Sequence, residues 1–319
     1  MAGMQTENSQ ELNDFSKGSI ARNILNLALP MTLAQLINVM YSIVDRIYIG
    51  HIPGASTYPL TGIGLCLPVI TIITAFANLF GMGGAPLCSI ARGRHEEDRA
   101  QKVMGNSFSM LLISGALLMA LCLAFKEPLL FLFGASDATY PYADQYITIY
   151  LCGTLFVMTS LGMNNFINSQ GFGKMGMLTV LLGAVLNIIL DPLFIFVFGM
   201  GVRGAAMATV ISQGASAVWV LKFLTGEKAI LKLTGRSMRP QARLIKEITL
   251  LGTSGFVMSV TNGTVQIVCN AVLARTGGDL YVGIMTVINS VREIITMPVT
   301  GLTSGAQPVI GYNYGAGCY

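Results

Sequence analysis

The sequence predicts an all-α polytopic membrane protein, and three observations support this prediction. First, 53% of the 319 residues are apolar and 11% are charged, whereas about 25% of a soluble domain is charged. Second, the mean hydropathy is +0.65. Third, long stretches contain no Asp, Glu, Lys or Arg: 47–91, 103–125, 145–173, 204–221 and 248–274. Each is long enough to supply the ~18–20 residues with which a helix crosses a bilayer.

Eight membrane spans follow in order from these stretches and from the polar breaks between them. The breaks are rich in Gly, Pro, Asp or charge, as in HIPGAS, RGRHEEDRAQK, FGASDATYPYAD, GFGKMG and RTGGD. The expected spans are 20–50, 60–91, 102–125, 142–171, 175–198, 204–224, 246–274 and 281–308. Residues 1–19 are charged and contain no apolar run before a cleavage site, so we expect a cytosolic tail and not a signal peptide.

The distribution of Lys and Arg predicts the orientation, because cytosolic loops are enriched in both. With a cytosolic N-terminus, the outer side receives Arg46, Lys126, Arg203 and Arg275, while Arg292 falls inside the eighth span. The other fourteen of the nineteen lie on the inner side: Lys17, Arg22, Arg92, Arg94, Arg99, Lys102, Lys174, Lys222, Lys228, Lys232, Arg236, Arg239, Arg243 and Lys246. This bias explains the net charge of +4 without any affinity for nucleic acid.

The basic loop 225–245 divides the expected domains. Residues 20–224 would form an N-terminal lobe of six helices, and residues 246–319 would begin a second lobe with two. SIVDRIYIGHIPG at 42–54 aligns with QIVCNAVLARTGG at 266–278, which suggests a repeat. A unit of six spans returns the next copy to the same orientation, so the repeats would be parallel. On this interpretation the chain stops after its eighth helix.

Ionisable residues inside predicted spans mark candidate functional sites, because a charge at membrane depth is costly. Asp45 lies near the outer end of the first span, and Asp191 lies about two-thirds of the way outward in the fifth. Tyr41 and Asn187 each precede an acid by four residues and therefore share its helix face. Both spans run outward, so the two acids can share one cavity. A carboxyl group there that exchanges a proton near neutral pH would suit a proton-driven transporter.

Structural explanations compete with these functional ones. Asp191 precedes Pro192 and could end a helix, but LFIFVF follows and a stop there would leave backbone groups unpaired in lipid. Asp45 and Arg46 could form an interfacial pair at a helix end. Arg292 and Glu293 are adjacent and point in different directions, so an ion pair with another helix is as good an explanation for them as transport.

Metal and cofactor chemistry finds no support in the sequence. His51 and His95 are isolated in different loops, and none of the six cysteines forms a CxxC pair. An integral membrane enzyme would need a cluster of His, Asp or Glu, so we expect neither an enzyme nor a bound cofactor.

The chain resembles the multidrug and toxic compound extrusion (MATE) transporters, most closely the bacterial DinF-like branch. The resemblance rests on segments in family order: LALPMTLAQLINVMYSIVDRIYIG, GMGGAPLCSIARGR, NSQGFGKMGMLTVLLGAVLNIILDPLFIF, GMGVRGAAMATVISQ and GAQPVIGYNYGA. It implies twelve helices in two six-helix lobes that open alternately, with helices nine to twelve absent here. It also implies a monomer in the cytoplasmic (inner) membrane that exports organic, often cationic compounds in exchange for H⁺ or Na⁺.

The resemblance also implies roles for individual residues. It carries a cation site onto Asp45, Asp191, Asn187, Tyr41 and Thr209, and a helix-bending role onto Pro30. Na⁺ could bind at Asp45, Asp191 and Asn187. Asn262 aligns with a seventh-helix Glu of other branches, so it is named with Arg292 and Glu293 as a second-lobe candidate.

Two alternatives to an exporter remain. A lipid-linked oligosaccharide flippase of the same superfamily would want several basic residues in its cavity, whereas the candidates here are acids. A truncated chain could also be a partner that does not transport.

Overall fold

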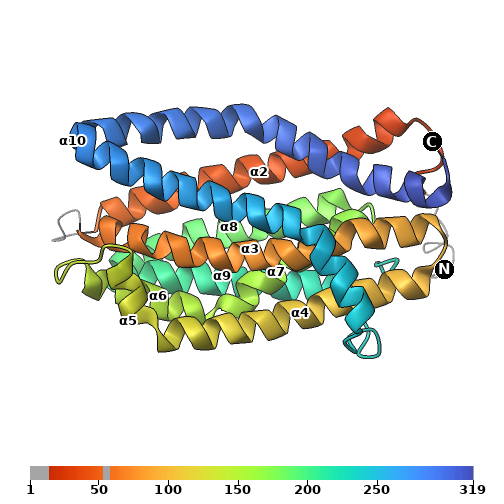
Figure 1. Ribbon diagram of the computed structural model, residues 1–319, viewed down its shortest axis with the longest axis horizontal. Helices are drawn as coiled ribbons and strands as arrows, with labels where there is room; N and C mark the ends of the chain where they lie inside the picture. The colour runs from red at the N-terminus through yellow and green to blue at the C-terminus, as the bar shows by residue number, and fades with distance from the viewer. Residues whose placement is uncertain (1–13, 53–57, 319) are drawn as a thin grey trace.

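The computed structural model describes residues 14–52 and 58–318, which form a long bundle of helices lying side by side (Figure 1). The elements in order are α2 (Ile20–Gly50), α3 (Tyr58–Gly93), α4 (Glu97–Ala124), α5 (Lys126–Leu132), α6 (Tyr140–Cys152), α7 (Thr154–Ser169), α8 (Gly173–Pro192), the π-helix η1 (Leu193–Val197), α9 (Val202–Thr225) and α10 (Ala242–Ala316). No strand occurs among these residues. The all-α membrane fold expected from the sequence is confirmed.

A shared apolar core joins α3, α4, α6, α7 and α9. Its largest fully buried side chains include Phe166, Met104 and Leu111. α2 packs instead against α8 and α10, beside this core. Large apolar side chains on the outer faces of α2 and α10, such as Leu33 and Val257, are exposed, as expected where a helix faces lipid.

The fourth expected span, 142–171, is broken and not continuous. α6 and α7 meet at Gly153 with a bend of 57°. The backbone of Gly153 lies so close to Val210 of α9 that a Cβ would be 2.5 Å from a Val210 methyl group. A close approach of this kind requires glycine, which explains the position of the bend.

The fifth span does not stop at Asp191. α8 passes directly into η1, and together they form an apolar span of 25 residues, Gly173–Val197. The amide of Phe198 donates to the carbonyl of Leu193 at 2.9 Å, five residues earlier, which is the hydrogen bond of a π-helix. The sequence argument that six apolar residues carry the helix onward is confirmed, although the wider turn was not expected.

The seventh and eighth expected spans, 246–274 and 281–308, belong to one element, α10. Its ribbon doubles back at the left of Figure 1, so the two arms lie along the bundle in opposite directions. The first arm packs on α3, where Gly252 lies against Leu79, and the second returns to α2 and to the end of α3, where Gly315 lies against Ile90. Among the described residues, six helices are long and apolar enough to span a membrane, or seven if the bent α6–α7 pair is one span.

Residues 226–241, which we call the strap, are docked on the bundle and do not hang free. Leu231 is fully buried and its amide donates to Oε1 of Gln170 at 2.8 Å. Asn106 of α4 accepts a hydrogen bond from the amide of Gln241 at 2.6 Å and donates to the carbonyl of Ser237 at 3.3 Å. The strap is therefore part of the first lobe in packing terms.

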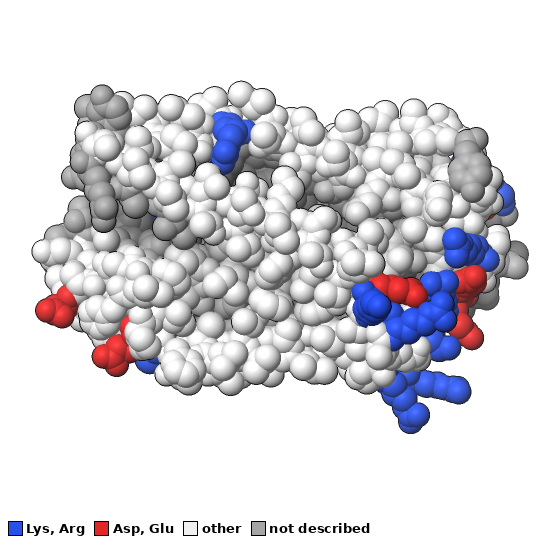
Figure 2. All heavy atoms as spheres, viewed as in Figure 1, with Lys and Arg blue, Asp and Glu red and all other residues white. Residues whose placement is uncertain are grey.

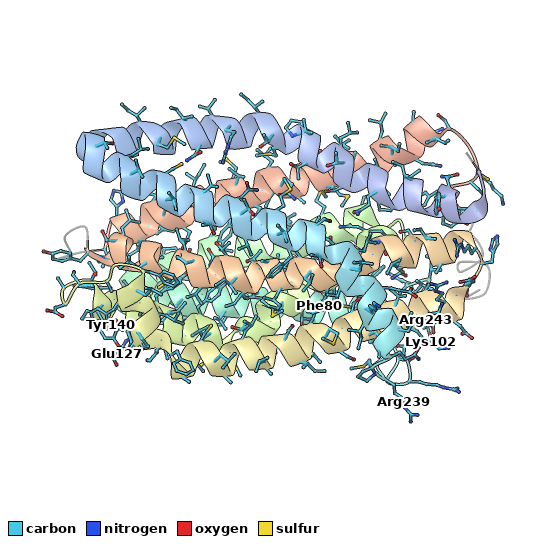
Figure 3. The ribbon with its side chains drawn as sticks, in the orientation of Figure 1. Phe80, Lys102, Glu127, Tyr140, Arg239 and Arg243 are labelled. Atoms are coloured by element: carbon cyan, nitrogen blue, oxygen red, sulfur yellow. The ribbon has the colours of Figure 1, made fainter. Side chains whose placement is uncertain are left out.

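The two ends of the bundle differ in charge. Figure 2 shows most of the visible Lys and Arg gathered at the right-hand end, which we call the basic end, together with some Asp and Glu, whereas the charged groups visible at the left-hand end are mainly acidic. Figure 3 places Lys102, Arg239 and Arg243 at the basic end, opposite Glu127 and Tyr140. α2 begins and α10 ends at the basic end as well (Figure 1).

Candidate functional site

Asp45 and Asp191 meet across the contact between α2 and α8. Their carboxyl groups lie close enough to interact electrostatically. Asp191 is fully buried, and Asp45 is partly buried. Oδ1 of Asp45 and Oδ2 of Asp191 are buried and accept no hydrogen bond from the described residues.

Asn187 and Thr209 hold Asp191 from the other side. The Asn187 amide, one turn before Asp191 on α8, lies 3.4 Å from Oδ1 of Asp191 and 3.4 Å from Oγ1 of Thr209 on α9. The Thr209 hydroxyl donates to the carbonyl of Ala205 at 3.0 Å. The Thr209 hydroxyl proton is therefore already used in a hydrogen bond, and the hydroxyl oxygen can only accept from the Asn187 amide. This arrangement orients the buried Asn187 side chain with its Oδ1 unpartnered.

Tyr41 completes the group that the sequence predicted. It lies one turn before Asp45 on α2, close to both acids, and it lines the same cavity as Asn187 and Thr209. The five residues Tyr41, Asp45, Asn187, Asp191 and Thr209 thus come together from α2, α8 and α9. We call them the acidic site.

Two further tyrosines of α6, Tyr146 and Tyr150, were missed. Both are buried and their rings stack with centroids 6.1 Å apart. Tyr146 lies close enough to Asp45 and Tyr41 to interact with them electrostatically, and Tyr150 interacts with Tyr41. Their spacing of four residues in YITIY places them on one helix face, and this was the available signal.

Local backbone structure fixes the position of Asp191. It is the last residue of α8 before Pro192, with which the helix ends, and the π-helix η1 follows. The start of α9 lies on η1 at Gly204, where a Cβ would be 2.7 Å from the carbonyl carbon of Phe194 and 3.0 Å from the amide of Ile195. This contact, available only to glycine, brings α9 and therefore Thr209 against the end of α8.

The acidic site offers oxygen atoms and no other metal ligands. Unpartnered oxygens of Asp45, Asp191 and Asn187 are the donors that hard cations take in proteins. No group of three or more His, Cys, Asp or Glu side chains occurs within the described residues, so a transition-metal site has no support there. The same oxygens suit a shared proton or a single small cation.

The acidic site opens onto a central cavity of about 370 Å³. Tyr41, Asn187 and Thr209 line it directly. The remaining lining comes from α2, α3, α7, α8, α9 and the second arm of α10, and none of the lining residues is charged. Most polar members are amides or hydroxyls: Gln35, Asn38, Asn78, Ser89, Ser160, Asn164, Asn165, Asn168, Ser169, Thr179, Ser212, Gln213, Ser216, Thr300, Ser304 and Gln307.

Pro30 lies inside α2, buried between two close contacts with α10. Gly305 packs on Ala28 and Gly301 packs on Thr32, one on each side of the proline. α2 nevertheless continues as one helix from Ile20 to Gly50. Since Pro30 has no amide hydrogen, the helix carries a weak point at this position.

The second-lobe candidates are not gathered into the cavity. Asn262 and Arg292 are both exposed on α10, and neither lines the cavity. The side chain of Glu293 lies outside the part of the chain that is described.

Comparison with known proteins identifies the family. The MatE family model matches residues 30–193 and 255–319, which include both acids and both arms of α10. The chain belongs to the MatE family. Its relatives include the multidrug export protein MepA of Staphylococcus haemolyticus, 28% identical over 307 residues, with 96% of this chain and 67% of MepA covered. MepA of Staphylococcus aureus strain MSSA476 is also 28% identical over the same length.

Solved MATE structures have the same fold. One described as the outward-facing conformation of a multidrug resistance MATE family transporter superposes with a TM-score of 0.89 at 25% identity, covering 96% of this chain and 67% of that one. A transporter of the same superfamily from Pyrococcus furiosus gives 0.88 at 25% identity, again with 96% and 67% covered. The chain thus spans about two-thirds of the length of its relatives. It is a multi-pass membrane protein of a family of multidrug exporters.

Proposed function

We propose that the protein is a cation-coupled antiporter that exports small organic compounds, often cationic, in exchange for H⁺ or Na⁺. One observation carries the proposal. Two neighbouring acids, each with a buried unpartnered oxygen, lie beside a cavity whose lining residues are all uncharged. A bound cation would therefore find its counter-charge at the acidic site alone.

The coupling step follows from the protonation state of the acidic site. With both acids ionised, the site attracts a cation or water, and each charge repels the other. Protonation, or Na⁺ binding, removes that negative charge and lets the α2–α8 contact tighten. The first half of α2 can then move about Pro30, where backbone hydrogen bonding is already interrupted. The cavity would lose both its counter-charge and part of its volume, which favours release of a cationic compound.

The orientation is part of the same proposal. The basic end, with the N-terminus and the strap, would face the cytosol, since Lys and Arg gather there. The transporter would act as a monomer in the cytoplasmic membrane.

The uncharged cavity favours an exporter over a lipid-linked oligosaccharide flippase. A pyrophosphate group would need Lys or Arg in the cavity, and the described lining residues include neither. Arg292, which lies inside the eighth predicted span, is exposed and lies outside the lining. A role as a partner that does not transport predicts drug binding without efflux from the 319-residue chain.

The test is efflux of a fluorescent cation from reconstituted vesicles, with a pH gradient or a Na⁺ gradient imposed separately. Asp191→Asn preserves the side-chain volume but cannot titrate, so coupled efflux should be abolished while drug binding stays measurable. Asn262→Ala, which changes an exposed amide outside the cavity, is the control and should leave efflux unaffected. Efflux by Asp191→Asn with an unchanged pH dependence would show that the acid is only structural.

A further inference from the structure

The segment before α2 is packed onto the end of α10, far away in sequence. Phe15 is only 5% exposed, and its ring meets Tyr312 edge to face, with centroids 5.6 Å apart. The Tyr312 hydroxyl donates to Oδ1 of Asp14 at 3.2 Å. The Asn313 amide donates to the carbonyl of Phe15 at 3.0 Å. Asp14 and Phe15 are therefore joined to Tyr312 and Asn313 by one ring contact and two hydrogen bonds.

Tyr312 also connects this segment to the first lobe. The guanidinium of Arg92, near the end of α3, lies 5.5 Å from the centre of the Tyr312 ring. The same guanidinium donates to the carbonyl of Ser169 at the end of α7 at 2.9 Å. A cation over an aromatic face is attractive, and more so when both are removed from water, as Arg92 is here. Tyr312 is thus held by Asp14 and Phe15 on one side and by Arg92 on the other.

Close backbone packing surrounds these contacts at the basic end. Gly93 of α3 lies against Tyr312, and Gly315 lies against Ile90, with no room for a Cβ at either glycine. Leu27, Val309, Phe15 and Tyr312 form a separate buried apolar cluster there. To open this end of the bundle, α10 would have to separate from α2 and α3, and the contacts of Tyr312 would have to break.

We propose that residues 14–19 form a latch that holds the basic end closed and favours the state in which the cavity opens toward the other end. The latch rests on the proposed alternating function, since its release would be required once in each transport cycle. Asp14 and Phe15 are the latch residues that make the contacts, and Tyr312 and Asn313 of α10 receive them. Truncation of the latch, or substitution of Asp14 or Phe15, should shift the equilibrium toward a state open at the basic end.

Two native cysteines provide a readout of this opening. Cys88 is fully buried one helical turn before Arg92, and it contacts Ser169, so it lies beneath the latch. Cys66 is also fully buried, but it lies near the other end of α3, where it contacts the carbonyl of Ala143. Local release of the latch should make Cys88 reactive, whereas general unfolding would expose both thiols.

The experiment is timed alkylation of the reconstituted protein with N-ethylmaleimide, with each cysteine quantified by peptide mass spectrometry. Phe15→Ala should speed alkylation of Cys88 roughly tenfold, since an aromatic contact and a buried ring are lost, and leave Cys66 unchanged. Tyr312→Phe removes only the hydrogen bond to Asp14 and should give a smaller increase. Phe125→Ala, a matched change of an exposed ring, should change neither rate.

Equal rates for Cys88 in the wild type and Phe15→Ala would overturn the latch, and so would a parallel rise at Cys66. The readout needs neither a drug nor an ion gradient. Loss of coupling in Asp191→Asn therefore tests the proposed function independently. A latch defect with normal coupling, and a coupling defect with a normal latch, can be told apart.

Discussion

Thr209 was an ordinary small residue by sequence pattern, yet it links α9 to α8 at the acidic site. Its hydroxyl donates to the carbonyl of Ala205 on its own helix and accepts from the Asn187 amide. Tyr41, Asp45, Asn187 and Asp191 could be grouped from the sequence because spacing by four residues and a shared helix direction bring them together. Tyr146 could not, because the rotation of α6 depends on the bend at Gly153.

Thr209→Val should leave one N–H of the Asn187 amide without its acceptor, while the other keeps Oδ1 of Asp191. An unsatisfied buried donor costs about 1–3 kcal/mol, so thermal stability in detergent should fall and coupled efflux should weaken. Thr264→Val is the matched control, since Thr264 is exposed and its hydroxyl bonds only to the carbonyl of Val260 on its own helix at 2.9 Å. Equal losses in the two variants would argue against the linking role of Thr209.

Asp14, outside the membrane spans, predicts a pH dependence of the latch. Burial alone would raise the pKa of Asp14, but hydrogen bonds from the Ser16 hydroxyl and amide and from Tyr312 outweigh it, so the pKa lies below its ordinary value. A lowered folded pKa means that the stabilisation is present above the unfolded pKa of about 3.9 and is lost as the pH falls through the folded value. The protection of residues 14–19 against hydrogen exchange, relative to the intrinsic rate at each pH, should therefore be constant from pH 7 to about pH 5.

The reference for that measurement is Asp14→Asn, which does not titrate. The ratio of exchange rates, variant to wild type, should fall toward one below the ordinary Asp range. A ratio that is independent of pH would show that the carboxylate contributes nothing to the latch.

At the scale of elements, the sequence patterns did not predict two features, the packing of the strap against the bundle and the π-helical turn of η1. Residues 225–245 were expected to be a polar connection, but Ala229, Leu231 and Leu233 are buried in alternation with Ile230 and Lys232. That alternation is visible in AILKL, although one short segment does not say against which surface it packs. Continuation of the fifth span through Pro192 was predictable from the six apolar residues after Asp191. The π-turn was not, because it depends on the contact with Gly204.

Gly204→Ala should disturb the acidic site from a distance. The added methyl group would overlap the η1 backbone near Phe194, and overpacking of this kind costs about 1–3 kcal/mol. We expect lower thermal stability and reduced coupled efflux, since η1 fixes the end of α8. Gly64→Ala on α3 is the control, because no atom lies within 4 Å of a Cβ there, and replacing an open helical glycine should be neutral or slightly stabilising. Similar losses in both would exclude an effect specific to η1.

At the scale of the whole molecule, charge alone predicts an orientation. Lys and Arg are enriched in cytosolic loops, so we expect the basic end to face the cytosol. The relative placement of the two arms of α10 was not predictable, since few charges lie between residues 248 and 291 and glycine contacts with α2 and α3 decide it.

Thiol labelling in intact cells tests the orientation. Cysteines introduced at Lys232 and Lys126, in a background without native cysteines, would be exposed to an impermeant reagent. Position 126 should react and position 232 should be protected until the cells are opened. Labelling of 232 without 126 would reverse the orientation and with it the side on which the latch acts.

The partners of the strap all precede it in the chain: Asn106, Ser109 and Gln170 belong to helices made earlier. During synthesis, which proceeds from the N-terminus, the first lobe can therefore seal this surface before α10 leaves the ribosome. α10 would then fold against a finished template, with the glycines of α3 already in place to receive its first arm. This order of synthesis would shorten the time during which the first-lobe surface that the strap covers is left without a packing partner.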